Sequence, residues 1–595
     1  MDTRTTATAM LMALSPLVWG CDDTSTSPTM AEPDTGAEMS EDTRQSNVDT
    51  TPTVDTRVPA TDPEALFSTL DIVWEPCPLE EGETDTDADC STTAMPMFWE
   101  AHDGSTLDVR AKRLRPEGDV TAQLWLVHGG PGASGVIGFP PLMASIQSLF
   151  PGLEVYTLDH RGTGYSGFLE CPEQQASDSP QGAAISSDEL EDCIAAMRQQ
   201  WGDGLETFGS TSSAIDLAAY MSASRRPDTP VYLWGGSYGA YLALRFLRLF
   251  PALSDGVILE GIVKPDTTFI DHDHTADTAG RALLAACAQD ETCASRFDDH
   301  PEAVMREALE RHREGLCEAI DIAPEAFQLL LVYMMYSFTT SSAVPALIHR
   351  YHRCAPEDGA ALGFLWNTLF GDQGQWVADA TDRSYSLLLQ IHVINSEMWA
   401  HPNHRLAEVR PRLESFWEAC LFCRRNIETY VNTYDIWPRY DDAPYDNSYA
   451  ESSVPMLMMH GRLDPTASAT EAEEVGAWFN GPHQTFIMFP QAAHNITSGT
   501  PYRPLTPACG VTLWLDFMTD PTGDLDNRCV EQVYPLNFEG STTLAQALLG
   551  TDSYFDLAGA QGKGNPTQAQ VMVDALKEIR QRIQRDRWAL YARQP

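Results

Sequence analysis

The sequence predicts an α/β protein in which a mostly parallel sheet is covered on both faces and interrupted by a large helical cap. Two observations predict this class. Short apolar runs that end in glycine turns alternate with helical stretches, as strands do in a doubly covered parallel sheet. A long segment of helical pattern then separates the early runs from the last two, which is typical of a cap inserted between core strands.

The N-terminal region predicts an exported protein. An apolar run from Met10 to Trp19 is too short to span a bilayer and ends shortly before Cys21. We interpret residues 1–20 as a signal peptide of the lipoprotein type and Cys21 as the lipidated residue, with an ordinary cleaved signal as the alternative. Residues 21–62 are rich in Thr, Ser, Pro and acids, have little to bury, and predict a disordered tether.

The strongly acidic composition limits the possible partners. The chain has 85 Asp and Glu against 38 Lys and Arg, which gives a formal net charge of −47. Nucleic-acid binding needs clustered Lys and Arg, so we expect no nucleic-acid partner. We expect membrane contact only through the lipid anchor.

The cysteines predict disulfides. The chain has 13 cysteines, and an even number is left once Cys21 is set aside. An even set in an exported protein is typical of a disulfide framework. Spacing gives no evident pairing for Cys317, Cys354, Cys420 and Cys423, and a zinc site at the last two would need a second ligand pair. Local spacing predicts four bridges: Cys77–Cys90, Cys171–Cys193, Cys287–Cys293 and Cys509–Cys529.

The order of strand and helix patterns divides the chain. Residues 63–264 form the first part of the predicted core and 454–555 its second part, which ends in a disulfide region. Residues 265–453 form the helical cap, and 556–595 contain a C-terminal amphipathic helix that we expect to pack against the domain. The apolar face of that helix is made by Ala569, Met572, Leu576, Ile579 and Ile583. Strands are expected within 105–114, 121–130, 153–162, 230–237, 255–263, 453–465 and 484–494.

The stretch "GGSYG" predicts a nucleophile at Ser237. It follows an apolar strand and precedes a helical pattern. A serine raised on a sharp strand-to-helix turn needs neighbours without side chains, because they crowd the adjacent strand and helix. This is the nucleophile elbow of the α/β-hydrolase fold, which we predict for this chain.

A serine nucleophile needs a base that is itself held by an acid. In this fold the acid and the histidine follow the serine along the chain, and Asp464 and His494 each follow a predicted strand. We therefore predict Ser237, Asp464 and His494 as the catalytic residues. Glu260, directly after another strand, is the alternative acid.

The oxyanion of the reaction needs N–H donors that are already in place. One is expected from the backbone of Tyr238, directly after the nucleophile. The second is expected from Gly130 in "HGGPG", which follows a predicted strand.

The same loop allows a different interpretation. Gly130, Gly132 and Gly135 spell G-x-G-x-x-G, and Asp159 stands where a ribose-binding acid of a dinucleotide enzyme is expected. Pro131 counts against this hypothesis because it removes an N–H from the turn that faces the pyrophosphate. The acidic stretch "DTDADC" (85–90) lacks the Gly and Glu of a calcium loop, and we interpret it as a solvated loop closed by a disulfide.

Taken together, the motifs resemble the prolyl iminopeptidase and tripeptidyl aminopeptidase family of α/β-hydrolases, in its secreted, disulfide-bearing bacterial branch. The resemblance covers scattered blocks between residues 71 and 555. The matching stretches are "WEPC" (74–77) with Cys90, "GGPGASG" (129–135), "YTLDHRGTGYS" (156–166), "GGSYGA" (235–240), "LDP" (463–465), "AAHNI" (492–496) and the segment from Cys509 to Cys529.

The resemblance implies a serine exopeptidase that releases one or a few residues from peptides with a free N-terminus and needs no metal or other cofactor. It also implies a cap carboxylate that binds the substrate ammonium, and Glu397 in "HVINSEMW" matches that acid best, although Asn395 stands where the branch often has cysteine. The main alternative is an esterase or lipase on the same fold. A non-catalytic surface-binding lipoprotein is a further alternative.

Overall fold

The computed structural model describes most of the chain from Phe67 to Arg585. The predicted signal peptide, the lipidation site Cys21 and the tether lie outside the described residues. Within this span the structure describes all residues except 101–102, 177, 180–184, 186–187, 299, 371–381, 400–405, 425–426, 442–444, 446, 504–505 and 558–565.

A nine-stranded sheet forms the centre of the fold, in the order β1-β2-β3-β5-β4-β6-β7-β8-β9. The first three pairings along this order are antiparallel and the other five are parallel. The parallel part therefore brings the carboxyl ends of five neighbouring strands beyond β5 to one edge. The strands are β1 (Glu75–Cys77), β2 (Ala88–Pro96), β3 (Thr106–Leu114), β4 (Ala122–Val127), β5 (Leu153–Leu158), β6 (Val231–Gly236), β7 (Gly256–Glu260), β8 (Met456–Gly461) and β9 (Gln484–Phe489).

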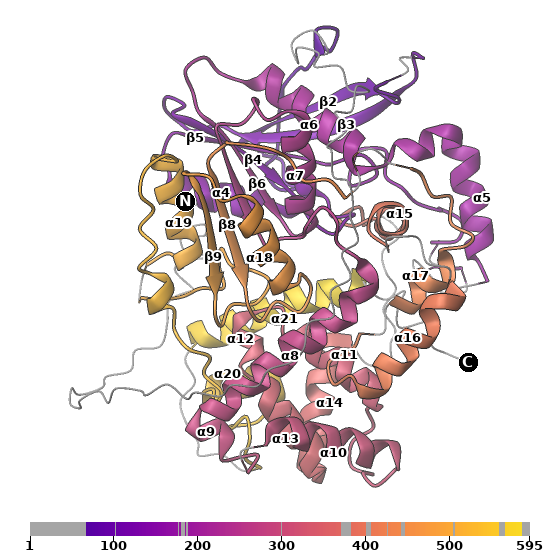
Figure 1. Ribbon diagram of the computed structural model, residues 1–595, viewed down its shortest axis with the longest axis vertical. Coiled ribbons are helices and arrows are strands. Elements are labelled where there is room, and N and C mark those ends of the chain that lie inside the picture. The colour runs from indigo at the N-terminus through magenta and orange to yellow at the C-terminus, as the bar shows by residue number, and fades with distance from the viewer. Residues whose placement is uncertain are drawn as a thin grey trace, which may run out of the picture.

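Helices cover both faces of the sheet, as the sequence predicts (Figure 1). Along β4, Trp125 and Val127 join the core that includes α6 and α7, whereas Leu124 and Leu126 join the core that includes α4 and α19. Burial of both faces explains why these strands are apolar throughout rather than alternating. The helices outside the cap are α3 (Gly135–Gly138), α4 (Pro140–Leu149), α5 (Leu190–Trp201), α6 (Ser210–Ser224), α7 (Tyr238–Leu249), α18 (Ala469–Trp478), α19 (Cys509–Thr519), α20 (Thr542–Leu549) and α21 (Pro566–Arg585).

The chain between β7 and β8 forms a cap below the sheet in Figure 1. The regular elements described there are helical, apart from a single bridge between Tyr385 and Ala133. Helix α11 is buried along most of its length, which explains its apolar sequence. The cap helices are α8 (His272–Gln289), α9 (Glu291–Ala294), α10 (Pro301–Arg313), α11 (Pro324–Met334), α12 (Phe338–Ser341), α13 (Val344–Arg353), α14 (Pro356–Phe370), α15 (Leu387–Glu397), α16 (Leu406–Ala419) and α17 (Ile427–Thr433).

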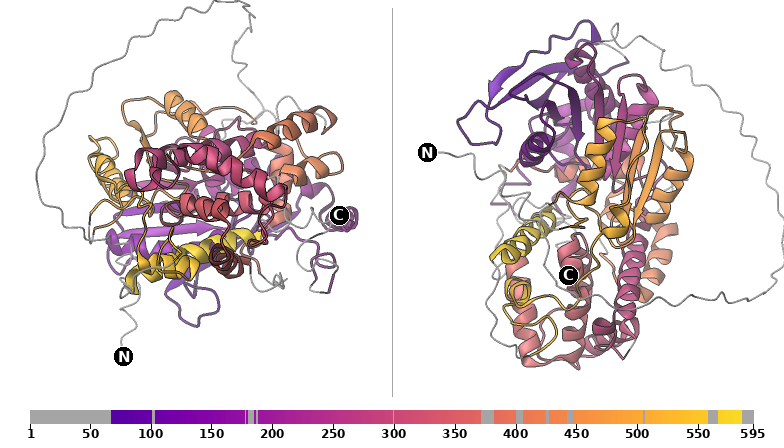
Figure 2. Two further views of the ribbon diagram at one scale, coloured as in Figure 1. Left: turned by 90° about the horizontal axis from the view of Figure 1, so that it is seen from below. Right: turned by 90° about the vertical axis from the view of Figure 1, so that its left-hand side faces the viewer.

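The C-terminal helix α21 closes the core of the cap. Met572, Leu576 and Ile579 are buried in the same apolar cluster as α11, α13 and α14. Figure 2 shows α21 lying against the cap helices, far along the chain from them. Among the described residues, no helix combines the length and apolarity needed to cross a membrane.

Six disulfides join the described residues. The four bridges predicted from spacing form, and two further bridges join Cys317 to Cys354 and Cys420 to Cys423. The bridge at Cys420–Cys423 removes the zinc interpretation, because its sulfurs are not thiolates. Such a set is typical of proteins that fold in an oxidising compartment.

The structure corrects the interpretation of the acidic stretch 85–90. Its end belongs to β2 rather than to a solvated loop, and Asp89 is buried between Arg113 and Arg115 at 2.9 and 2.7 Å. The strand is not evident from the sequence because Asp, Ser and Thr interrupt its apolar pattern. The arginines that neutralise Asp89 lie on the next strand (Arg113) and directly after it (Arg115).

Candidate active site

Ser237 stands on a sharp turn between β6 and α7. Its backbone has φ 59° and ψ −127°, a conformation that L-residues rarely adopt. The turn leaves no room for side chains beside the serine. A Cβ at Gly235 would lie 2.1 Å from the Gly239 oxygen, and one at Gly239 would lie 2.2 Å from the Val127 oxygen. The glycine pattern in the sequence is therefore a steric requirement of the elbow.

Asp464 and His494 meet at the ends of neighbouring strands, where the sequence placed them. The Nδ1 atom of His494 lies 2.7 Å from Oδ2 of Asp464, and both side chains are buried. The other oxygen, Oδ1, accepts hydrogen bonds from the amides of Thr466 and Ala467 at 2.8 and 3.0 Å.

The environment of Asp464 keeps its carboxyl group ionised. Burial by itself would raise the pKa, but the His494 imidazole, its hydrogen bond and the Ala467 amide hold the pKa at about 2. A carboxylate only accepts hydrogen bonds, so Nδ1 of His494 carries a proton and Nε2 is left as the basic atom.

The segment Glu260–Gly261 lies between the serine and the histidine. The backbone N–H of Ser237 donates to the Glu260 oxygen at 2.9 Å. Gly261 faces the imidazole, since a Cβ there would lie 2.9 Å from Cε1 of His494. The candidate nucleophile and the candidate base thus contact consecutive residues of one segment, Glu260 and Gly261.

The predicted oxyanion loop lies directly against the elbow. A Cβ at Gly129 would be 2.9 Å from Cβ of Ser237 and 3.4 Å from the amide nitrogen of Tyr238. The next residue, Gly130, is exposed and has φ 121°. Gly129, the neighbour of Gly130 in the chain, therefore lies against the serine and the amide of Tyr238, where α7 begins.

The cap holds this loop in place. The amide of Ser134 donates to the Ser384 oxygen at 2.9 Å, and the amide of Ser386 donates to the Gly132 oxygen at 2.8 Å. The ring of Tyr385 covers the loop, 3.3 Å from where a Cβ of Gly130 would lie. No pattern in the sequence identified this contact, because the cap segment lies far along the chain from the loop.

Replacing Gly132 with alanine should disrupt this contact. A Cβ at Gly132 would lie 2.3 Å from the Ser386 oxygen, on a residue with φ 114°. We expect kcat to fall by about 100-fold, the effect of misplacing a reacting group by about 1 Å. Gly104→Ala is the matched control for backbone strain, because Gly104 has φ 87° and open space around it. Equal kcat values for the two variants would contradict a role for the contact.

Glu397 is placed at the end of α15, buried under the elbow helix. Its Oε1 accepts from the Ser210 amide at 2.8 Å and from the Tyr440 hydroxyl. Its Oε2 accepts from the Tyr241 hydroxyl at 3.1 Å and lies 3.5 Å from Arg245. A substrate ammonium would therefore have to replace one of these donors.

Three other histidines, His128, His160 and His460, lie near strand ends, and the rings of His128 and His460 accept backbone hydrogen bonds. His460 accepts from the Ile262 amide at 3.0 Å, and burial lowers its pKa, which keeps the ring neutral. Burial also lowers the pKa of His160 to about 4. The Gly129 amide donates to His128 at 2.8 Å. None of the three contacts Asp464 as closely as His494 does.

The dinucleotide interpretation does not fit the geometry of its acid. The buried Asp159 carboxylate accepts from the Ser134 hydroxyl at 2.6 Å and from the amides of Val136 and Tyr165 at 3.0 and 2.9 Å. These bonds join the glycine loop to the turn after β5. Asp159 thus supports the loop rather than presenting a carboxylate to a ribose.

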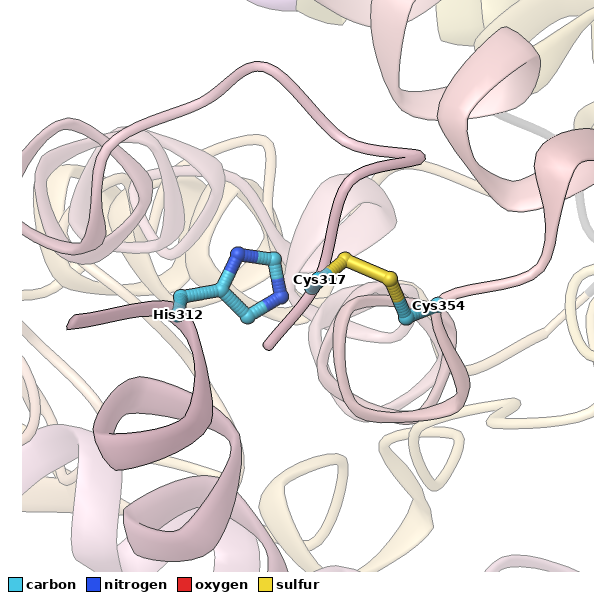
Figure 3. A group of neighbouring side chains, drawn as sticks. All are labelled: His312, Cys317 and Cys354. Atoms are coloured by element: carbon cyan, nitrogen blue, oxygen red, sulfur yellow. A yellow bond between two sulfur atoms is a disulfide. The ribbon is translucent and has the colours of Figure 1, made fainter. Parts of the chain in front are cut away.

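One group of described side chains resembles a metal site in composition. His312, Cys317 and Cys354 lie within ligand distance of one another (Figure 3). However, the two sulfurs form a disulfide, and the His312 ring stacks on Tyr351 at 3.5 Å. The group as it stands is a bridge packed beside a histidine, and it offers no thiolate.

Comparison with known proteins agrees with the architecture. Residues 124–286 match the family model described as the alpha/beta hydrolase fold. No curated protein matches the chain. The chain is similar to a carboxyl esterase from Bacillus coagulans, at 14% identity over 67% of this chain and 89% of that chain, with a TM-score of 0.26. It is also similar to the esterase RhEst1 from Rhodococcus sp. ECU1013, at 13% identity over 69% and 95% of the two chains, with a TM-score of 0.28.

A further similarity is to a proline iminopeptidase from Mycobacterium smegmatis, at 15% identity over 67% of this chain and 90% of that chain, with a TM-score of 0.26. The matched region 124–286 runs from β4 through the elbow into α8. Together with the order of the parallel strands, this match confirms the predicted fold class: the chain has the α/β-hydrolase fold.

Proposed function

We propose that this protein is an exported serine exopeptidase that releases one or a few residues from peptides with a free N-terminus. The observation that carries the serine chemistry is the pairing of His494 with Asp464 at 2.7 Å beside a serine held on the elbow. A buried, ionised carboxylate that orients an imidazole is the arrangement that lets a serine hydroxyl react.

The reaction follows from the position of these groups. The Ser237 oxygen forms a bond to the scissile carbonyl carbon while His494 Nε2 takes the hydroxyl proton. The amide N–H groups of Gly130 and Tyr238 stabilise the oxyanion, and the start of α7 adds its helix dipole. His494 then gives the proton to the leaving amine, and a water molecule cleaves the acyl-enzyme by the same steps in reverse order. Asp464 stabilises the imidazolium in both halves.

The proposed specificity for substrates with a free N-terminus rests on the cap and on the motif resemblance. Helix α15 begins at the oxyanion loop and ends at the buried carboxylate of Glu397, so a single rigid element joins the two sites. The second candidate function is an esterase, which needs no acid that binds an amine. It is favoured by the four protein donors that already surround the Glu397 carboxylate.

Hydrolysis of matched chromogenic peptide amides with free and acetylated N-termini tests the proposal. We expect the purified full chain to cleave the free forms and to leave the acetylated forms uncut. Equal cleavage of both forms, or turnover of simple esters only, would leave the esterase as the better account.

The variant Glu397→Gln measures the contribution of the cap acid. Removing one partner of a buried charge pair typically costs about 2–5 kcal/mol, so we expect the preference for free over acetylated peptides to fall by at least about 30-fold. Glu531→Gln, at an exposed position, is the matched control. If Glu397 were only structural, both substrate classes would lose activity equally and the preference would not change.

A further inference from the structure

Glu260 is a buried acid to which the proposed reaction gives no part. It ends β7 next to the elbow, and its side chain is only 5% exposed. Asp464, not Glu260, pairs with His494, so Glu260 is not the acid of the triad. Burying a carboxylate is costly unless hydrogen bonds compensate it, so its contacts indicate what the residue does.

The Glu260 carboxylate binds the loop that carries His494. Its Oε1 accepts from the amides of Ile496 and Thr497 at 2.7 and 3.0 Å. The hydroxyl of Thr497 donates to Oε2. These donors follow His494 by only two and three residues, in a loop that contains no helix or strand.

The backbone of Glu260 binds the other half of the site. Its carbonyl oxygen accepts from the Ser237 amide at 2.9 Å. Gly261 then contacts the His494 ring from the side of β7. One residue therefore holds the nucleophile through its backbone and the loop of the base through its side chain.

We propose that Glu260 is a positioning residue that keeps His494 in register with Ser237 by hydrogen bonding to residues 496–497. The inference rests on the proposed serine chemistry and extends it to a residue that touches neither substrate nor the reacting atoms. Proton transfer needs the base within hydrogen-bond reach of the serine, and a displacement of about 1 Å costs about 100-fold in rate. His494 lies in a segment after β9 that forms neither helix nor strand, so its position depends on individual hydrogen bonds such as those to Glu260.

The test compares Glu260→Met with Glu260→Gln. Methionine fills the space, and its thioether sulfur is only a weak acceptor for the three donors. Glutamine accepts from both amides through its oxygen and donates to the Thr497 hydroxyl through its nitrogen, so all three contacts persist without the charge. We expect the methionine variant to lose about 100-fold in kcat at an unchanged KM, and glutamine to restore most of it. Wild-type kcat in Glu260→Met, or equal losses in both variants, would overturn the proposal.

A second pair of variants, at Thr497, tests the proposal even if the methionine variant misfolds. Thr497→Val removes one of the three donors, and Thr497→Ser keeps it. We expect a lower kcat in the valine variant and recovery in the serine variant, at equal Tm. Equal kcat values for the two would overturn the proposal even if Glu260→Met did not fold.

Labelling by a fluorophosphonate separates this proposal from the proposed function. The reagent reacts with a serine activated by a base and needs no peptide subsite. We expect the labelling rate to fall in Glu260→Met by the same factor as kcat. If the wild-type chain is not labelled at Ser237, the serine mechanism itself is wrong. If it is labelled and Glu260→Met is labelled equally fast, only the role of Glu260 is wrong.

Discussion

Replacing Ser237 with alanine is expected to lower kcat by about 10⁴- to 10⁶-fold, the range over which the triad of a serine hydrolase acts as a unit. Alanine at this position has no oxygen to attack the carbonyl, although the oxyanion donors and the subsites would persist. The elbow should survive the change, because its strain lies in the backbone at φ 59° and alanine has a Cβ like serine.

The control for this variant is Ser148→Ala, which removes an exposed hydroxyl on α4. We expect it to retain wild-type kcat, and both variants to keep the wild-type Tm. The measurement is the initial rate of hydrolysis at a saturating concentration of the chromogenic substrate that the wild-type chain cleaves. Activity of Ser237→Ala within tenfold of wild type, after contaminating hydrolase is excluded with an inhibitor, would contradict the mechanism.

The largest expected loss of stability follows from replacing Arg161 with alanine. Arg161 belongs to the "DHRGTG" stretch and is fully buried. Its Nε and Nη2 donate to the two oxygens of Asp216 at 2.8 and 2.7 Å, and Nη1 donates to the Met97 oxygen at 3.0 Å. Alanine would leave the Asp216 carboxylate buried without its cation. Removing one partner of a buried ion pair typically costs about 3–5 kcal/mol of unfolding free energy.

Thermal unfolding followed by circular dichroism checks this expectation. Arg528→Ala is the matched control, since Arg528 pairs with Asp526 at the surface and its side chain is 83% exposed. Exposed pairs contribute little, so the control should leave Tm unchanged. Similar Tm values for the two variants would contradict the structural role of Arg161. A large loss of kcat at unchanged Tm would instead assign this arginine to the site.

The parts of the fold that local sequence encodes were predictable. Apolar runs ending in glycine predicted the parallel strands, and the glycines around Ser237 predicted the elbow. Both features depend on residues that are close together in the sequence. Bridges such as Cys287–Cys293, whose cysteines are six positions apart, follow from spacing alone. The Cys317–Cys354 bridge spans 37 residues and depends on how α10 and α13 pack, which spacing does not encode.

The supports of the candidate site depend on contacts between distant segments, and the sequence does not reveal them. Asp464 and His494 could be paired because both follow strands in the order that this fold requires. The amide of Ser210 lies 187 residues from the Glu397 that it binds, and Ile496 lies 236 residues from Glu260. The sequence also left Glu260 as an alternative acid. The tertiary structure distinguishes the two acids, because Asp464 pairs with the His494 imidazole and Glu260 accepts from the backbone amide of Thr497.

Mass spectrometry of the chain after reaction with a fluorophosphonate shows directly whether Ser237 is the nucleophile. We expect one adduct, on the peptide that contains Ser237, which appears as hydrolytic activity is lost. The adduct should be absent from Ser237→Ala and should form much more slowly in His494→Ala. An adduct on a different serine that accompanies the loss of activity, or full activity after Ser237 is modified, would show that Ser237 is not the nucleophile.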